Sequence, residues 1–240
     1  MQGMNHPRRL SGSLTALLAL FMCFPALAQA PPAPPAPGGV AHFVVVLDAA
    51  HGGDDPGARL GNQAEKDLTL ALSVKLRSLL MARGIAVVTT RESDAAVVAD
   101  RRAEMANRAN AAACLNLHAA LASPNNGPAV HLFLSSLPAA KDVRFVPWRK
   151  AQSTWIVRST ALAGALNSAL TQAGVTVTLG RTALPAIDSM TCPAVAVEIA
   201  PQRRTDAAGA DDADFEAKVA QALAAALVEW RSDTLGERQP

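Results

Sequence analysis

The chain has 240 residues, half of which are hydrophobic, so it is long enough to bury one hydrophobic core and we expect one folded domain. Its 22 basic and 20 acidic side chains nearly balance, which argues against a nucleic-acid-binding protein. Few residues are aromatic and none is tyrosine, so the sequence shows no stacking platform for bases or for long sugar chains.

The first 30 residues have the three-part layout of a secretion signal. Arg8 and Arg9 form a basic start, an apolar run occupies Leu14–Leu27, and Ala-Gln-Ala at 28–30 is a small-x-small cleavage site. We therefore expect residues 1–30 to be a signal peptide and the mature protein to be periplasmic or secreted. Cleavage removes two of the 22 basic residues and no acidic one, which leaves 20 of each. No later stretch reaches the roughly 18 apolar residues of a spanning helix, so we expect no membrane span after cleavage.

Residues 31–40 begin PPAPPAP and are interpreted as a proline-rich linker. The folded domain is expected over 41–232, followed by a flexible tail at 233–240. Within the domain, short apolar β-branched runs alternate with segments of helical period. Strands are predicted at 43–48, 85–90, 113–118, 129–135, 183–187 and 194–199. Helices are predicted at 65–83, 97–111, 150–173 and 212–230. This pattern predicts an α/β fold: a single three-layer domain with a mostly parallel six-stranded sheet and helices on both faces.

Side chains suited to metal binding or proton transfer follow three of the predicted strands. His51 follows the first strand, His118 ends the third, and Glu198 ends the last. Glu65 opens the first helix after a glycine-rich loop. Ligands of open α/β sheets bind at the carboxyl ends of the strands, so we expect these four side chains at one edge of the sheet.

Two histidines and a glutamate suit Zn²⁺, which takes three protein ligands at catalytic sites and keeps a fourth position open. His51, Glu65 and His118 are the candidate ligands. Hydrolysis of an amide also needs a base that passes a proton to the leaving nitrogen, and Glu198 is the candidate catalytic residue.

Each of these residues also has an ordinary structural interpretation. A glutamate that opens a helix complements the helix dipole, and a histidine beside glycines is usually a solvated loop residue. A carboxylate that closes an apolar strand, such as Glu198, is harder to explain by structure alone. The other histidines after the signal, His42 and His131, begin strands and are assigned to structure, on the opposite edge from the expected crevice.

Four charged residues near the predicted site, Asp48, Asp54, Asp55 and Arg102, are explained at least as well by turn chemistry and surface pairing. Cys23 lies inside the predicted signal. Cys114 and Cys192 either pair with each other or are buried singly, because two thiols without distance information leave both readings open.

Five segments resemble, in order and spacing, the zinc N-acetylmuramoyl-L-alanine amidases of the amidase 3 family. They are LDAAHGGDDPGA (47–58), EKDLTLAL (65–72), TRESD (90–94), RAEMANRANAAACLNLHA (102–119) and CPAVAVEIA (192–200). The resemblance extends over about residues 43–230. It implies that His51, Glu65 and His118 bind zinc and that Glu198 is the catalytic base.

The same resemblance implies a zinc amidase catalytic domain over 41–232. Its substrate would be peptidoglycan, cleaved between N-acetylmuramic acid and the L-alanine of the stem peptide during cell-wall remodelling or cell separation. A regulatory activator protein is a further candidate partner. In some relatives the region that corresponds to 136–152 carries an occluding regulatory helix, and the sequence leaves open whether this segment covers the site.

The chain departs from the family pattern in three loops. Ala49-Ala50 stands where the family usually has Pro-Gly, residues 116–120 read NLHAA in place of SIHAN, and residues 199–202 replace a Gly-Phe with a nearby Ser-Asn. Because these loops help to orient substrate, an alternative hypothesis is a catalytically weakened peptidoglycan-binding or regulatory module of the same fold. The retained Glu198 favours an enzyme, since a binding module requires no base.

Other hydrolase classes are less consistent with the sequence. A serine hydrolase of the α/β type would carry a Gly-x-Ser-x-Gly elbow, and a typical zinc peptidase would carry an HExxH helix motif. The sequence contains neither motif.

Overall fold

The computed structural model describes residues 43–122, 127–142, 144–201 and 210–236. The predicted signal peptide at 1–30, the predicted linker at 31–40, and His42 lie outside the described residues. Among the helices described, none combines the length and apolar character needed to cross a membrane.

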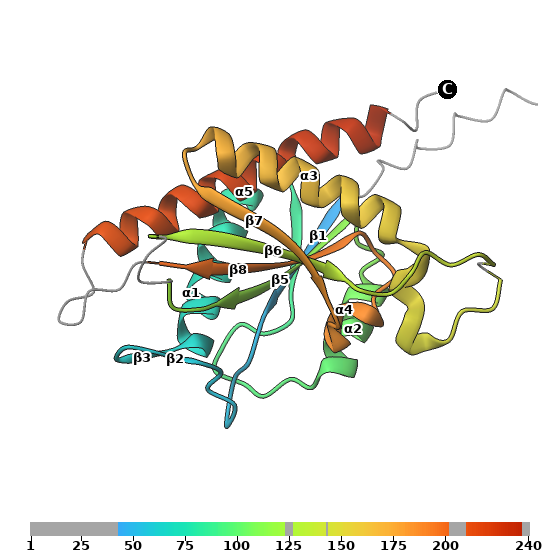
Figure 1. Cartoon of the computed structure of the whole chain (residues 1–240), viewed down its shortest axis with the longest axis horizontal. Helices are drawn as coiled ribbons and strands as arrows, with labels where there is room; N and C mark the ends of the chain where they lie inside the picture. Colours follow the sequence, from blue (N-terminus) through green and yellow to red (C-terminus); the bar gives the residue numbers. More distant parts are fainter. Residues whose placement is uncertain (1–42, 123–126, 143, 202–209, 237–240) are drawn as a thin grey trace, which may run out of the picture. The chain divides into compact units, whose positions relative to one another are not determined.

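Six strands form one sheet in the order β4-β1-β5-β8-β6-β7 (Figure 1). Their bounds are β1 (Val44–Ala49), β4 (Ala86–Thr89), β5 (Ala113–Ala119), β6 (Ala129–Ser135), β7 (Thr176–Thr182) and β8 (Ala194–Ala200). Strands β4, β1, β5 and β8 are parallel, and β6 runs antiparallel to β8 while β7 is parallel to β6. The predicted α/β class with a mostly parallel six-stranded sheet is confirmed.

Helices cover both faces of the sheet. The helical elements are α1 (Glu65–Met81), α2 (Ala99–Arg108), η1 (Trp148–Thr154, a 3₁₀ helix), α3 (Ile156–Gln172), α4 (Pro185–Asp188) and α5 (Ala210–Gly236). Helices α1, α3 and α5 share one apolar cluster with alternate strand residues, whereas α2 and α4 share the other cluster with the intervening ones. The large apolar residues of α1 recur every four positions, at Leu68, Leu72, Leu76 and Leu80, and form its buried stripe.

Strand alternation decides which face the polar residues occupy. On β5, Leu115 and Leu117 pack in the α1 cluster while Cys114 packs in the α2 cluster. Since successive side chains point to opposite faces, Asn116 and His118 lie on the α2 side. The candidate site therefore develops on the α2 side of the sheet, at the ends of β1, β5 and β8.

Two local predictions were wrong, and one small sheet was not predicted. The segment 183–187 is not a strand: β7 lies earlier, at Thr176–Thr182, and Pro185 begins the short helix α4, because proline has no N–H for a ladder and suits the first helical position. The single helix predicted at 150–173 is divided into η1 and α3. A two-stranded ribbon of β2 (Arg59–Leu60) and β3 (Gln63–Ala64) was not predicted.

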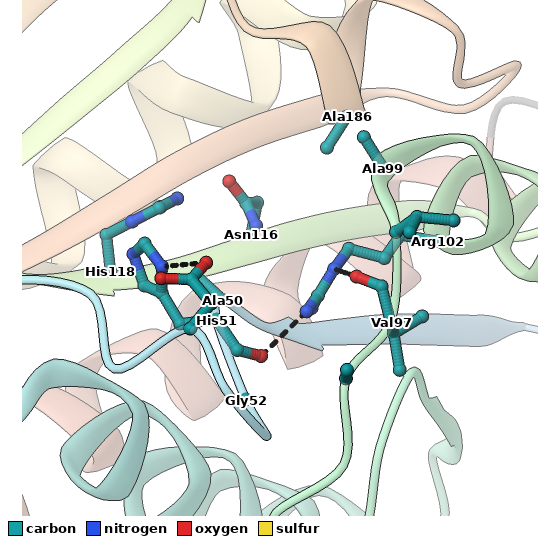
Figure 2. Close-up of a pocket in the computed structure, with 12 residues that line it drawn as sticks. Ala50, His51, Gly52, Val97, Ala99, Arg102, Asn116, His118 and Ala186 are labelled. Carbon is teal, nitrogen blue, oxygen red and sulfur yellow. Dashed lines mark hydrogen bonds and ion pairs between the residues drawn. The ribbon is translucent and has the colours of Figure 1, made fainter.

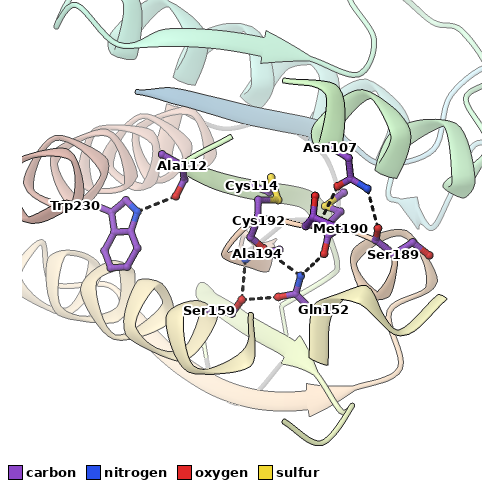
Figure 3. The surroundings of a disulfide bond; sticks show 11 residues. Asn107, Ala112, Cys114, Gln152, Ser159, Ser189, Met190, Cys192, Ala194 and Trp230 are labelled. Atoms are coloured by element: carbon purple, nitrogen blue, oxygen red, sulfur yellow. Dashed lines mark hydrogen bonds between the residues drawn. A yellow bond between two sulfur atoms is a disulfide. The ribbon is translucent and has the colours of Figure 1, made fainter. Parts of the chain in front are cut away.

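Cys114 and Cys192 form a disulfide with a Cα–Cα distance of 6.3 Å (Figure 3). The bond connects β5 with the loop that leads into β8. Beside it, the amide nitrogen of buried Gln152 donates to the carbonyl oxygens of Met190 and Cys192, at 3.0 and 3.1 Å. Ser159 Oγ lies 2.5 Å from Gln152 Oε1 and accepts a bond from the Ala194 N–H. These contacts fix the start of β8, the strand that carries Glu198.

Candidate active site

His51, Glu65 and His118 come together at the carboxyl ends of β1 and β5. The Nε2 atom of His51 lies 3.1 Å from Glu65 Oε2, and Nδ1 of His118 lies 2.8 Å from Glu65 Oε1. One potential ligand atom from each residue falls within 4.8 Å of the others. We call these three residues the ligand cluster.

Glu65 is the buried centre of the cluster, with 5% of its surface exposed. Burial raises its pKa, but the hydrogen bond with His118 and the backbone N–H groups of Ala58 and Ala119 outweigh that effect and bring the pKa to about 2. Glu65 is therefore a carboxylate at neutral pH. It can balance the charge of a cation held between the two histidines.

The loop conformation aims His51 into the cluster. His51 has a φ of 62°, and Gly52 follows with a φ of 127°. A Cβ atom on Gly52 would lie 2.3 Å from the carbonyl oxygen of Ala95, so only glycine fits there. Asp55 Oδ2 accepts a hydrogen bond of 2.8 Å from His51 Nδ1, which leaves Nε2 facing Glu65. This bond also lowers the pKa of Asp55 below its usual value.

Asp48 and Arg102 are not surface residues, so the prediction of surface pairing was wrong for them. Their side chains are 1% and 7% exposed and form an ion pair of 2.6 Å. Thr90 Oγ1 and Asn116 Nδ2 also donate to the Asp48 carboxylate, and Arg102 Nη2 donates to the His51 carbonyl oxygen. A buried carboxylate such as that of Asp48 is unfavourable unless it is paired and hydrogen-bonded. The groups that pair with it also hold the loop that carries His51 in place. Exposed Asp54 lies in a turn.

Two further residues that brace this loop were not singled out from the sequence. Arg91 donates from Nε to the carbonyl oxygen of Ala49 at 3.0 Å and from Nη2 to that of Ala50 at 2.9 Å. Asp94 Oδ1 accepts from the Gly53 N–H at 2.7 Å. Both residues belong to the TRESD segment, which is one of the five segments that resemble the family. The family resemblance could therefore have pointed to them, whereas the chemistry of each residue taken alone could not.

Glu198 lies on β8 beside His118 of β5, as its direct partner in the parallel register. The two side chains therefore project from the same face of the sheet. Glu198 is half-buried, and no hydrogen bond or ion pair reaches its carboxylate from the described residues. His131, which was predicted on the opposite edge, is instead the partner of Glu198 on β6, so that prediction was wrong.

A cavity of about 410 Å³ opens beside the ligand cluster (Figure 2). Figure 2 shows His51 and His118 together on one side and Val97 and Ala99 on the other. The residues that line the cavity are Ala50, His51, Gly52, Asp55, Ala96, Val97, Val98, Ala99, Arg102, Asn116, His118 and Ala186. None of the described residues between 136 and 152 lines this cavity.

The cluster suits a zinc ion in donor chemistry and in space. Two imidazole nitrogens and a carboxylate are a common zinc ligand set for hydrolysis. A Cβ atom on Gly57 would lie 2.6 Å from His51 Cδ2 and 2.7 Å from Glu65 Oε2, so the absence of a side chain there lets the two ligands meet. His51, Glu65 and His118 therefore form a possible metal site.

Comparisons with known proteins give the family of this chain. The model of the amidase 3 family, described as N-acetylmuramoyl-L-alanine amidase, matches residues 45–229. The germination-specific N-acetylmuramoyl-L-alanine amidase of Bacillus subtilis is 45% identical over 51 residues, which cover 21% of this chain and 22% of that protein.

Solved amidase structures share the fold, among them the following two. The catalytic domain of CwlV, an N-acetylmuramoyl-L-alanine amidase from Bacillus (Paenibacillus) polymyxa var. colistinus, has a TM-score of 0.62 and 24% identity, and the match covers 79% of this chain and 98% of that one. The CwlD amidase of Clostridioides difficile, solved in complex with the GerS lipoprotein, has a TM-score of 0.61 and 21% identity over 79% of this chain and 98% of its own. The family model spans most of the folded domain, and the chain therefore belongs to the amidase 3 family of N-acetylmuramoyl-L-alanine amidases.

Proposed function

We propose that this chain is a zinc hydrolase that cleaves the amide bond between N-acetylmuramic acid and L-alanine in peptidoglycan. The observation that carries the proposal is the ligand cluster with Glu198 beside it in register. Membership of the amidase 3 family supports the substrate class.

His51, Glu65 and His118 would hold the zinc ion. A zinc ion bound there would supply Lewis-acid polarisation of the scissile carbonyl and would acidify water. The Asp55 bond fixes the tautomer of His51, and two backbone N–H groups orient the Glu65 carboxylate. The protein thus presents its donor atoms already arranged, so that little reorganisation is needed on loading.

Glu198 would be the general base. Its carboxylate would take a proton from the attacking water and deliver it to the amide nitrogen, as the new C–O bond forms and the C–N bond breaks. An amide nitrogen leaves poorly unless it is protonated, so this transfer is required. A half-buried carboxylate with no hydrogen-bond partner among the described residues is free for that role.

The proposed location is the periplasm or the cell exterior, after removal of residues 1–30. The Cys114–Cys192 disulfide supports this location because such bonds persist in oxidising compartments. N-terminal sequencing of the exported protein tests the cleavage. A protein activator is a further proposed partner, since a relative of the same fold, CwlD, is solved in complex with a lipoprotein.

The decisive experiment is digestion of purified peptidoglycan by the mature protein, followed by mass analysis of the soluble products. We expect free stem peptides that begin with L-alanine, loss of their release with a chelator, and recovery when zinc is added back. Binding of peptidoglycan without peptide release would favour the non-catalytic module. Release of products cut elsewhere in the stem peptide would contradict the proposed bond.

A further inference from the structure

A row of four side chains crosses the sheet on the α2 side at the level of the site. In register, His118 of β5 is the partner of Glu198 of β8, Glu198 is the partner of His131 of β6, and His131 is the partner of Thr178 of β7. Register partners project from the same face. Glu198 therefore stands between two histidines, one from the ligand cluster and one outside it.

His131 is fixed by its neighbour on the outer side. Its Nδ1 atom lies 2.5 Å from Thr178 Oγ1. The two edges of an imidazole ring face opposite directions, so the Nδ1 edge toward β7 turns the Cδ2–Nε2 edge toward β8 and Glu198. If the Thr178 hydroxyl donates to Nδ1, the neutral imidazole of His131 is protonated at Nε2, and this atom is then a hydrogen-bond donor.

Glu198 is flanked by two histidines, and the one from the ligand cluster, His118, would be reserved for the metal under the proposed function. His118 directs Nδ1 to Glu65 within the ligand cluster. His131 lies outside this cluster, and no hydrogen bond or ion pair reaches its Nε2 atom within the described part of the chain. A flexible glutamate side chain with no fixed contact samples several rotamers, whereas a proton-transferring carboxylate must meet its water in one geometry.

We propose that His131 is a positioning residue that acts through Glu198: its Nε2–H donates to the Glu198 carboxylate and holds it in the proton-accepting orientation. Thr178 supports this contact by fixing the ring. In the resting structure the two side chains are not within ion-pair distance, and the contact forms when substrate confines Glu198 over the site. The inference rests on the proposed function, because it assigns Glu198 as the base.

The test uses mature, zinc-loaded protein and a soluble N-acetylmuramoyl peptide as substrate. His131→Ala should lower kcat by about 10-fold, the effect of losing one hydrogen bond to a charged group, with little change in KM or zinc content. His131→Gln retains an N–H donor near the Nε2 position and should recover most of the rate, whereas the shorter amide of His131→Asn should not. Thr178→Val, which removes only the hydroxyl, should give an intermediate loss.

A double-mutant cycle separates positioning from direct substrate binding. In a Glu198→Asp background the carboxylate is one methylene further from His131, so the added His131→Ala change should cost less than about twofold. An equal loss in both backgrounds, or a loss confined to KM, would overturn the proposal. Unchanged kcat in His131→Ala would also overturn it while leaving the amidase function intact. If wild-type protein released no stem peptide, the proposed function itself would fail, which is a distinguishable result.

Discussion

Asp48 and Arg102 form a buried ion pair, with 2.6 Å between Oδ1 and Nη1, at the base of the loop that carries His51. The same guanidinium donates to the His51 carbonyl oxygen at 2.7 Å. A single arginine thus both neutralises the carboxylate at the end of β1 and fixes the backbone of a candidate ligand.

We expect Arg102→Met to lower the free energy of unfolding by about 3–5 kcal/mol, because it leaves the Asp48 charge buried without its partner. Urea denaturation measures this loss. Arg101→Met is the matched control: Arg101 is 52% exposed and pairs on the helix surface with Glu104, so its loss should cost about 0–1 kcal/mol. Similar stability of the two variants would contradict the role given to Arg102.

Zinc should bind at about one ion per chain, through the ligand cluster. His51→Ala and His118→Ala should each lose most of the metal, because two remaining donors bind zinc weakly. Metal analysis of the purified variants decides this. His131→Ala should retain the metal and serves as the control histidine. Full retention of zinc in both His51→Ala and His118→Ala would contradict the assignment of these residues as ligands.

Glu198→Gln should keep the fold and the zinc but lower amide hydrolysis by a factor on the order of 10² to 10⁴, because it keeps the shape and removes the basic carboxylate. Zinc stoichiometry, melting temperature and release of stem peptide are measured on one preparation. A loss of zinc in parallel with activity would indicate that Glu198 is a metal ligand. A lower melting temperature would indicate that its role is structural. Glu229→Gln, at an exposed position on α5, should leave all three readouts unchanged.

Gly52→Ala should destabilise the protein and weaken zinc binding. The new Cβ would lie 2.3 Å from the Ala95 carbonyl oxygen, and the φ of 127° is strained for alanine, so a cost of about 1–3 kcal/mol is expected. Gly164→Ala is the opposite case, because nothing lies within 4 Å of its Cβ inside helix α3; it should stabilise by about 0.5–1 kcal/mol. Denaturation curves and metal analysis compare the two, and equal effects would refute the steric argument.

Removal of the disulfide by the double change Cys114→Ala and Cys192→Ala should lower the free energy of unfolding by about 2–5 kcal/mol, since the bond closes a loop over 78 positions of sequence. Reductant should lower the stability of the wild type and leave the double variant unaffected. A wild-type protein with two free thiols after export would contradict the bond.

Most of the fold could be predicted from sequence because the signals are local. The β-branched runs of β1 and β8 and the four-residue spacing of leucines on α1 predict their elements directly. The position of β7 was predicted wrongly because an exposed edge strand has no clear alternation of buried and exposed residues. The short apolar run near Pro185 resembled a buried strand instead.

The sequence by itself determined the candidate ligands His51, Glu65 and His118 and the candidate base Glu198, because their residue types and their places after strands are readable along the chain. Only the tertiary structure decided which side chains meet them. The Asp48–Arg102 pair and the Cys114–Cys192 bond join positions 54 and 78 residues apart, and spacing gives no distance between such positions. The antiparallel placement of β6 beside β8 brings His131 next to Glu198, and this neighbour depends on strand order and register, which long-range packing sets.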